Sequence, residues 1–520
     1  MTIEEKVGQI LMVHFHGEQA NNDAKILISQ AHVGGFIYFN WSNGLNTPQQ
    51  VQNLSNELQE IANRNLNPIP LLIAVDQEGG VVARLKQGFT VFPGNSAIAR
   101  TNIPSFAEKC AYATSIELKA VGINMILGPV VDVNVNPLNP IIGVRSFSNS
   151  PETVTIFAKE ALKGYERARI ISVLKHFPGH GDVTLDSHAD LPIVDKSLKK
   201  LNETELYPFA SLSKYANAIM TAHLLVPALD PFRCATLSKY IIENILRKNF
   251  NYNGVVITDS LVMKGFLTNC PNIEEAAIRA FEAGSDLLIL GGKQLLDEDR
   301  FELTTKDTLR IYHHLLEAVY SGRISEQRLN ASVNRILSMK QKYNLFNYSP
   351  SKSQDIESNI NTDSHKKLAR EIANLSLNND ANNCTHPQKF NEMRVAVFAP
   401  KLTEYEINHT NISRIGKETK TMFFEQLNPT EIECAIAHKL VNWAETIIVC
   451  TYNAWKNDRQ VQFIKSLKTL NKPITIIALR DPQDGKVLQN DVNFVISTLS
   501  PDSYSIQSAI DILTGVTNAF

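Results

Sequence analysis

The chain has 520 residues, more than one hydrophobic core usually holds, so we expect two or three domains. Hydrophobic residues make up 43% of it and charged residues 20%, the proportions of a soluble globular protein. With 51 basic and 53 acidic residues, the formal net charge is −2. Such a balance produces no long-range attraction to nucleic acid or to anionic lipid, so the composition predicts neither as a partner.

The N-terminal segment and the cysteines predict a cytoplasmic protein. The segment MTIEEKVGQILMVHFHG is acidic where a secretory signal is basic, and its apolar run is short. We find no run of about 18 uncharged apolar residues that would predict a membrane span. The cysteines lack CxxC spacing and therefore predict reduced thiols rather than disulfides or a zinc site. They are Cys110, Cys234, Cys270, Cys384, Cys434 and Cys450.

Short apolar runs alternate with helix-like segments through the first two thirds of the chain. The runs cover residues 9–15, 34–39, 70–76, 122–133, 171–177, 218–224, 254–260 and 285–291. They lack period-2 alternation, as expected for parallel strands that are covered on both faces. Eight β/α units predict a TIM-type (β/α)8 barrel over residues 1–342. A doubly wound open sheet is the structural alternative.

The composition changes after the predicted barrel. Residues 343–389 are rich in Asn, Ser, Asp and Lys, which predicts a linker, and SHKKLAREIANLSL within it has the apolar spacing of one helix. The runs RVAVFAP, TIIVCTYN, PITIIALRD and NFVISTL then predict strands. Residues 390–520 are therefore expected to form a smaller, sandwich-like α/β domain.

Polar side chains follow most of the predicted barrel strands, at the ends where TIM-barrel enzymes hold their chemistry. They are Asp76, Glu78, Asp132, Lys175, His176, His223 and Asp259. Any one of them could simply bond to a loop or cap a helix, as Asp259 before Ser260 could. Together they predict a polar pocket at one end of the barrel.

The segment KHFPGHGDVTLDSHADLP, residues 175–192, holds three histidines, three aspartates and two glycines. Gly179 and Gly181 favour a sharply turning loop. Asp186 and His188 are two residues apart, so they could form a pair in which the carboxylate orients the imidazole for proton transfer near neutral pH. A solvated turn is the alternative for this pair.

This segment resembles the signature of the β-N-acetylglucosaminidases (β-hexosaminidases) of glycoside hydrolase family 3, and its DSH loop separates them from the β-glucosidases of that family. Four more segments resemble the family in its order. They are AVDQEGGVVARL (74–85), GPVVDVNVNPLNPIIGVRSF (128–147), TAHLLVPALD (221–230) and GVVITDSLVMKG (254–265). The linker helix and the second domain resemble the two-domain members, so the resemblance extends beyond the barrel.

The resemblance implies a retaining exo-β-N-acetylglucosaminidase that uses no metal or other cofactor. Asp259 matches the nucleophile, His188 the acid/base, and Asp186 its dyad partner. The positions that bind the sugar match Asp76, Arg84, Arg145, Lys175 and His176. A carboxylate below the ring can trap the oxocarbenium-like state covalently, and charged hydrogen bonds can orient the sugar.

Two positions depart from the family pattern. Val81 stands where the family commonly has arginine, although Arg84 keeps the expected binding position. In the second domain, ALRDPQD (478–484) departs from the Arg-Asn-Pro pattern of the two-domain members.

The expected substrates are N-acetylglucosamine-containing glycans, and muropeptides of cell-wall recycling are the usual substrates of the cytosolic bacterial relatives. Three other functions remain open. A phosphorylase of the same family is one, because a neutral imidazole does not repel phosphate. A metal-dependent TIM-barrel hydrolase is another, with His176, His180, Asp182 and His188 as ligands. A non-catalytic sugar-binding protein is the third.

Overall fold

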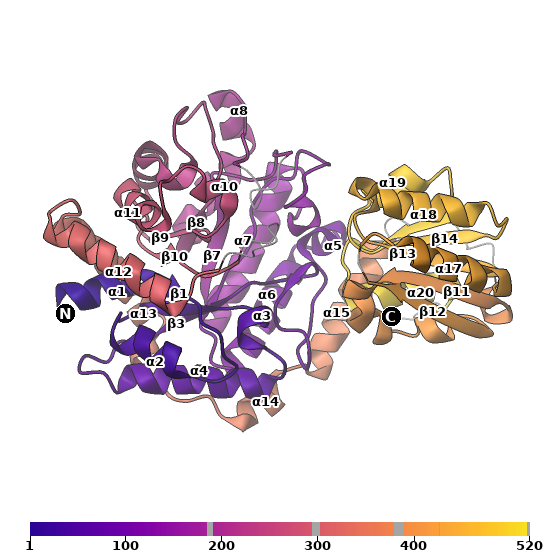
Figure 1. Ribbon diagram of the computed structural model, residues 1–520, viewed down its shortest axis with the longest axis horizontal. Coiled ribbons are helices and arrows are strands. Elements are labelled where there is room, and N and C mark those ends of the chain that lie inside the picture. The colour runs from indigo at the N-terminus through magenta and orange to yellow at the C-terminus, as the bar shows by residue number, and fades with distance from the viewer. Residues whose placement is uncertain (185–190, 294–301, 379–388, 426, 517–520) are drawn as a thin grey trace. The chain divides into compact units, whose positions relative to one another are not determined.

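The computed structural model describes residues 1–184, 191–293, 302–378, 389–425 and 427–516 (Figure 1). Their contacts divide the chain into two compact units. The first contains Met1–Glu78, Val82–Thr90 and Ala107–Thr362, and the second contains Gly79–Val81, Val91–Phe106 and Asp363–Phe520. Two short segments inside the predicted 1–342 domain thus pack with the second unit.

The first unit is built on an eight-stranded parallel sheet, in the order β10-β1-β2-β3-β6-β7-β8-β9. Its strands are β1 Leu11–Val13, β2 Gly35–Tyr38, β3 Leu72–Val75, β6 Met125–Ile126, β7 Ile171–Phe177, β8 Ala218–Thr221, β9 Val255–Thr258 and β10 Leu288–Ile289. A parallel bridge between Ile257 and Leu287 joins the two ends of this order. The sheet therefore forms the predicted barrel and not the open sheet, and each of the eight predicted runs contains one of its strands. A short hairpin, β4 Gln77–Gly79 with β5 Val82–Ala83, follows β3.

The barrel strands are buried along their whole length. All seven residues of β7 are buried, as are all four of β3 and of β9. Side chains of one strand alternate between the barrel interior and the surrounding helices, and both environments are apolar. This is the physical reason why the sequence runs lack period-2 alternation.

Helices separate consecutive strands and surround the barrel (Figure 1). Two of the long ones begin with a capping side chain followed by proline: Thr47 and Pro48 at α4, and Ser150 and Pro151 at α7. The helices up to the linker are α1 Ile3–Gln9, α2 Asn22–Ser29, α3 Asn40–Asn43, α4 Pro48–Asn63, α6 Ser105–Ala120, α7 Pro151–Ala168, α8 Leu198–Glu203, α9 Leu206–Leu212, the π-helix η4 Tyr240–Asn249, α10 Lys264–Leu267, α11 Ile273–Ala283, α12 Thr305–Tyr320 and α13 Glu326–Lys342. Short 3-10 helices are η1 Gly143–Arg145, η2 Ser213–Tyr215, η3 Ala235–Leu237 and η5 Leu345–Asn347. Within the described part of the chain, no helix is both long and apolar enough to cross a membrane.

The region predicted as a linker with one helix contains two, α14 Ser353–Asn359 and α15 Asp363–Asn378. The second unit includes α15, α5 Asn95–Arg100 and a five-stranded parallel sheet in the order β12-β11-β13-β14-β15. Its strands are β11 Arg394–Pro400, β12 Glu418–Phe424, β13 Thr446–Thr451, β14 Ile474–Ala478 and β15 Phe494–Ser497. Its other helices are α16 Glu404–Asn408, α17 Glu431–Trp443, α18 Asp458–Lys468, α19 Gln483–Leu488, α20 Ser503–Thr514 and the 3-10 helices η6 Phe390–Glu392, η7 Lys401–Thr403, η8 Ile412–Arg414 and η9 Ala454–Lys456.

Both faces of this second sheet are covered. Val395 and Val397 of β11 pack in one hydrophobic cluster with α15 and α20, whereas Ala396 and Phe398 pack in another with α17 and α18. Alternate residues of one strand thus reach opposite helical layers. The predicted smaller α/β domain is confirmed as a parallel sheet between two layers of helices.

Lys340 of α13 is fully buried in the barrel unit. Its Nζ donates hydrogen bonds to Gln9 Oε1 at 2.8 Å and to the Gly34 carbonyl at 3.0 Å. Desolvation lowers the pKa of Lys340 from 10.5 to about 7. The unfolded chain therefore binds a proton between these two pH values that the folded chain does not bind, so this group makes the protein more stable as the pH rises through that window.

Substitution Lys340→Met is expected to remove this pH dependence, because methionine does not titrate. The difference in unfolding free energy between the unsubstituted protein and the variant should increase by about 1.4 kcal/mol per pH unit between pH 7 and 10, in favour of the unsubstituted protein. Urea unfolding at three pH values within that range measures the difference. Lys199, which is 85% exposed, provides the control substitution Lys199→Met. If the difference in unfolding free energy does not change with pH, the pKa of Lys340 is not lowered in the folded protein.

Candidate active site

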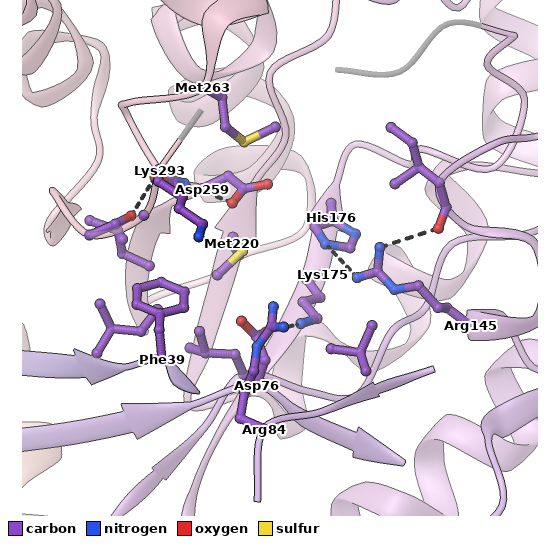
Figure 2. A pocket seen from close by; sticks show the side chains of 18 of the residues that line it. Phe39, Asp76, Arg84, Arg145, Lys175, His176, Met220, Asp259, Met263 and Lys293 are labelled. Carbon is purple, nitrogen blue, oxygen red and sulfur yellow. Dashed lines mark hydrogen bonds and ion pairs between the residues drawn. The ribbon is translucent and has the colours of Figure 1, made fainter. Parts of the chain in front are cut away.

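Six of the eight candidate site residues line one pocket of the barrel unit, with a volume of about 300 Å³. They are Asp76, Arg84, Arg145, Lys175, His176 and Asp259 (Figure 2). The volume is at the lower end of the range for small-molecule sites, about 300–1,000 Å³. Asp186 and His188, the other two candidates, lie outside the described residues.

Two buried cations cross-link the acids that follow β3. Lys175 Nζ lies 2.7 Å from Asp76 Oδ1 and 2.6 Å from Glu78 Oε1. Arg145 donates two hydrogen bonds to Glu78, from Nε at 2.9 Å and from Nη2 at 2.8 Å. Burial by itself raises the pKa of Glu78, but Arg145 and Lys175 lower it well below its ordinary range. Glu78 is therefore ionised, and it holds both cations in place.

Glu78 does not line the pocket, whereas its two cationic partners do. The Glu78 side chain is 3% exposed and that of Asp76 is 18% exposed. Burial lowers the pKa of Lys175, but the nearby Asp76 and Glu78 carboxylates raise it above its ordinary value overall. This part of the pocket wall thus presents the Asp76 carboxylate and the cations of Lys175 and Arg145, a set that can accept from and donate to the hydroxyl groups of a polar ligand.

His176 is held in one orientation by Asp132, which lies beyond β6. The Nδ1–H group of His176 donates to Asp132 Oδ2 at 2.7 Å, and Asp132 Oδ1 accepts from the backbone N–H groups of His176 and His180. Burial raises the pKa of Asp132, but the nearby His176 lowers it overall. The other ring nitrogen, Nε2, lies 3.4 Å from Arg145 Nη2. Both nitrogens of His176 therefore contact protein groups, which does not favour His176 as a metal ligand.

Asp259 follows the last residue of β9 and lines the pocket (Figure 2). Asp76 follows β3 and Lys175 belongs to β7, so three strands contribute these residues. Its Oδ1 accepts a hydrogen bond from the Ser260 N–H at 2.7 Å. Ser260 in turn donates from Oγ to the Gly291 carbonyl, and its own carbonyl accepts from His223 Nε2 at 2.9 Å. The role of His223, predicted only as a polar strand end, is thus to position the backbone beside Asp259.

Arg84 is placed by a polar side chain within the hairpin that follows β3. Gln77 Oε1 accepts from the backbone N–H groups of Arg84 and Leu85, and Gln77 Nε2 donates to the Leu85 carbonyl at 2.8 Å. The Arg84 N–H also lies 3.3 Å from the Asp76 carbonyl. These contacts turn the chain back, so that Arg84 lines the pocket beside Asp76.

The apolar side of the pocket was not predicted from the sequence. It includes Phe39, Trp41, Met220 and Met263, with Lys293 beside them. Phe39 and Trp41 are stacked, with ring centroids 5.0 Å apart and planes at 20°. Phe39 follows β2 directly. Its position at a strand end is the feature of the sequence that could have predicted it as a pocket residue. An aromatic surface of this kind is suited to the carbon–hydrogen face of a sugar ring.

The pocket lies at the carboxyl ends of the parallel barrel strands, and acids, cations and an apolar wall surround it. These features define a TIM-barrel enzyme for a small polar ligand. Residues 2–339 match the Glycosyl hydrolase family 3 N terminal domain. The chain therefore belongs to glycoside hydrolase family 3, as its motifs predicted, and is a glycoside hydrolase.

Some similar proteins match nearly the whole chain, and others match a shorter part of it. The chain is 32% identical to β-hexosaminidase A of Pseudoalteromonas piscicida over 486 residues, which are 86% of this chain and 78% of that protein. It is 33% identical to a β-hexosaminidase of Idiomarina loihiensis over 298 residues, 56% of this chain and 87% of the relative. A solved family 3 β-N-acetylglucosaminidase from Paenibacillus sp. str. FPU-7 superposes with a TM-score of 0.88 at 34% identity, covering 99% of this chain and 97% of that one.

Proposed function

We propose that the protein is an exo-β-N-acetylglucosaminidase, which releases terminal N-acetylglucosamine from β-linked glycans. The observation that carries this proposal is that six residues from four family motifs line one pocket of about 300 Å³. The names of the relatives, β-hexosaminidase and β-N-acetylglucosaminidase, support it.

The test compares 4-nitrophenyl N-acetyl-β-D-glucosaminide with the corresponding β-D-glucoside. We expect kcat/KM to be much higher for the first compound, and a preference for the glucoside would contradict the proposal. Product analysis with and without phosphate separates hydrolysis from phosphorolysis. Free N-acetylglucosamine at every phosphate concentration supports the hydrolase, whereas N-acetylglucosamine 1-phosphate supports the phosphorylase.

The charged wall of the pocket is proposed to bind the sugar. The Asp76 carboxylate would accept hydrogen bonds from ring hydroxyls, while Lys175, Arg145 and Arg84 would donate to hydroxyl and acetamido oxygens. His176 would offer Nε2 toward the same region, since Asp132 holds its Nδ1. Because Glu78 and Asp132 fix these groups before the sugar binds, little side-chain entropy is lost on binding.

The proposed reaction retains the configuration at the anomeric carbon. An Asp259 oxygen attacks that carbon, the bond to the leaving oxygen breaks, and His188 donates its proton to that oxygen. Water then attacks the glycosyl-enzyme, His188 takes a proton from it, and Asp259 is released as a carboxylate. Asp186 would orient the imidazole throughout both steps.

The variant His188→Ala is expected to lose about 10²-fold or more in kcat on substrates with poor leaving groups, because proton donation contributes about 10²–10⁴-fold. On 4-nitrophenyl substrates the loss in the first step should be much smaller, since nitrophenolate departs without a proton. Paired kinetics on nitrophenyl and alkyl glycosides measure this contrast. His313→Ala on the exposed face of α12 is the matched control. An equal loss of kcat/KM, which reports the first step alone, on both substrate types would exclude His188 as the proton donor.

We further propose muropeptides as natural substrates and the cytoplasm as the location. The described cysteines are free thiols, Cys110, Cys234, Cys270, Cys434 and Cys450, which is the state that a reducing compartment maintains. Comparison of a muropeptide with chitobiose tests the substrate. A higher kcat/KM for chitobiose would contradict the role in cell-wall recycling.

A further inference from the structure

Two histidines and a glutamate meet at the edge of the pocket, outside the set of proposed catalytic residues. His14 Nε2 lies 2.8 Å from Glu302 Oε1, and His16 Nε2 lies 2.6 Å from the same oxygen. The three potential ligand atoms lie within 4.8 Å of one another. His14 directly follows β1, so its position is fixed by the barrel.

The chemistry of this cluster matches a transition-metal ion. Two imidazoles and one carboxylate are the protein ligands of many zinc sites, in which one further position is left for water. Bonds of about 2.0–2.2 Å in a tetrahedral site place ligand atoms roughly 3.4 Å apart. The Glu302 oxygen now lies 2.8 and 2.6 Å from the two nitrogens, which is shorter than that spacing. The carboxylate would therefore have to move away by less than about 1 Å for an ion to replace the two hydrogen bonds.

Exposure and surroundings also suit an ion. The His14 side chain is fully buried, while those of Glu302 and His16 are 22% and 58% exposed. One ligand is therefore rigid, and an ion can enter past the other two. The Trp41 ring lies 5.4 Å from the His14 ring and 5.7 Å from the His16 ring, which gives the cluster an apolar wall on the pocket side.

The cluster connects the first and last strands of the barrel. Leu11 and Met12 of β1 pair with Leu288 and Ile289 of β10, and Glu302 is bridged to Lys293, which lines the pocket. An ion at this position would hold the segment after β1 to the segment after β10. It would thereby fix the part of the pocket wall formed by Lys293 and Trp41.

We propose that His14, His16 and Glu302 form a binding site for a divalent transition-metal ion, with Zn²⁺ as the best match. The site is distinct from the proposed catalytic residues, so no chemical step of glycoside cleavage passes through the ion.

The experiment uses the full chain and Trp41, one of its three tryptophans, as the reporter. Co²⁺ should quench part of the tryptophan fluorescence in a saturable way, and Zn²⁺ should reverse the quenching by competition. Trp41→Phe should abolish this signal. His16→Gln and Glu302→Gln should each weaken Co²⁺ binding by about 10²-fold. His313→Gln, on an exposed face of α12, should leave it unchanged.

Calorimetric titration with Zn²⁺ provides the second measurement. One equivalent of Zn²⁺ should bind to the unsubstituted protein and be lost in Glu302→Gln. Because Glu302 and His16 are both partly exposed, neither substitution is expected to unfold the chain, and circular dichroism checks this. Unchanged Zn²⁺ stoichiometry and affinity in both folded variants would overturn the proposal. Hydrolysis of the nitrophenyl N-acetylglucosaminide by both variants tests the proposed function separately.

Discussion

Replacing Asp259 with alanine is expected to lower kcat for a β-N-acetylglucosaminide by about 10³-fold or more. Asp259 follows β9 and lines the pocket, and the hydrogen bonds of Ser260 hold its backbone. Without its carboxylate no glycosyl-enzyme can form. The variant should fold, because the contacts of Ser260 with Gly291 and His223 do not involve the Asp259 side chain.

Asp259→Asn is the matched variant, since it keeps the shape of the side chain but not its charge, and it should be similarly inactive. Asp195→Ala, at an exposed position, is the control and should retain full activity. A slow substrate with fluorine on the sugar ring should label Asp259, and mass spectrometry locates the label. Labelling of another carboxylate, such as Asp76, would show that a different residue is the nucleophile.

Replacing Lys175 with methionine is expected to destabilise the barrel unit by about 3–5 kcal/mol, the usual cost of removing one partner from a buried ion pair. Lys175 is 2% exposed and contacts both Asp76 and Glu78. Arg145 would still compensate Glu78, but Asp76 would lose its cation. The same substitution should also raise KM, because the charged wall of the pocket would be rearranged.

Urea unfolding and kinetics of Lys175→Met and of the double variant Lys175→Met, Asp76→Asn test this account. Removing the Asp76 charge should restore part of the lost stability, because the carboxylate that lost its cation is then neutral. It should not restore KM, since neither charge of the pair then remains to bind the sugar. If the double variant is no more stable than the single one, the two residues do not act as an ion pair.

The barrel strands could be predicted from the sequence, but their lengths could not. The run 122–133 reads as one strand, yet β6 is only Met125–Ile126, and beyond it Val130 makes a single bridge to Lys175. Strand pairing depends on the backbone of a neighbouring strand, which the apolar pattern does not specify.

The strand β12 of the second unit was missed because it lies at the edge of its sheet. Glu418 and Lys420 are exposed, and the other residues of ETKTMFF are only partly buried until Phe424. An edge strand has one neighbour and one edge open to water, so polar residues are tolerated in it and the apolar run that marks the central strands is absent.

By itself the sequence determined the barrel and the strand ends that carry polar groups, because apolar runs and strand-end positions are local properties of the chain. Asp76, Arg84, Arg145, Lys175, His176 and Asp259 were all predicted for the site, and all line the pocket. Only the tertiary structure decided that Glu78 lies behind the pocket wall and that Trp41 lines it. It alone brought His14 to Glu302, 288 residues further along the chain. That contact exists because β1 pairs with β10 when the barrel closes, and no local pattern encodes a pairing between the first and last strands.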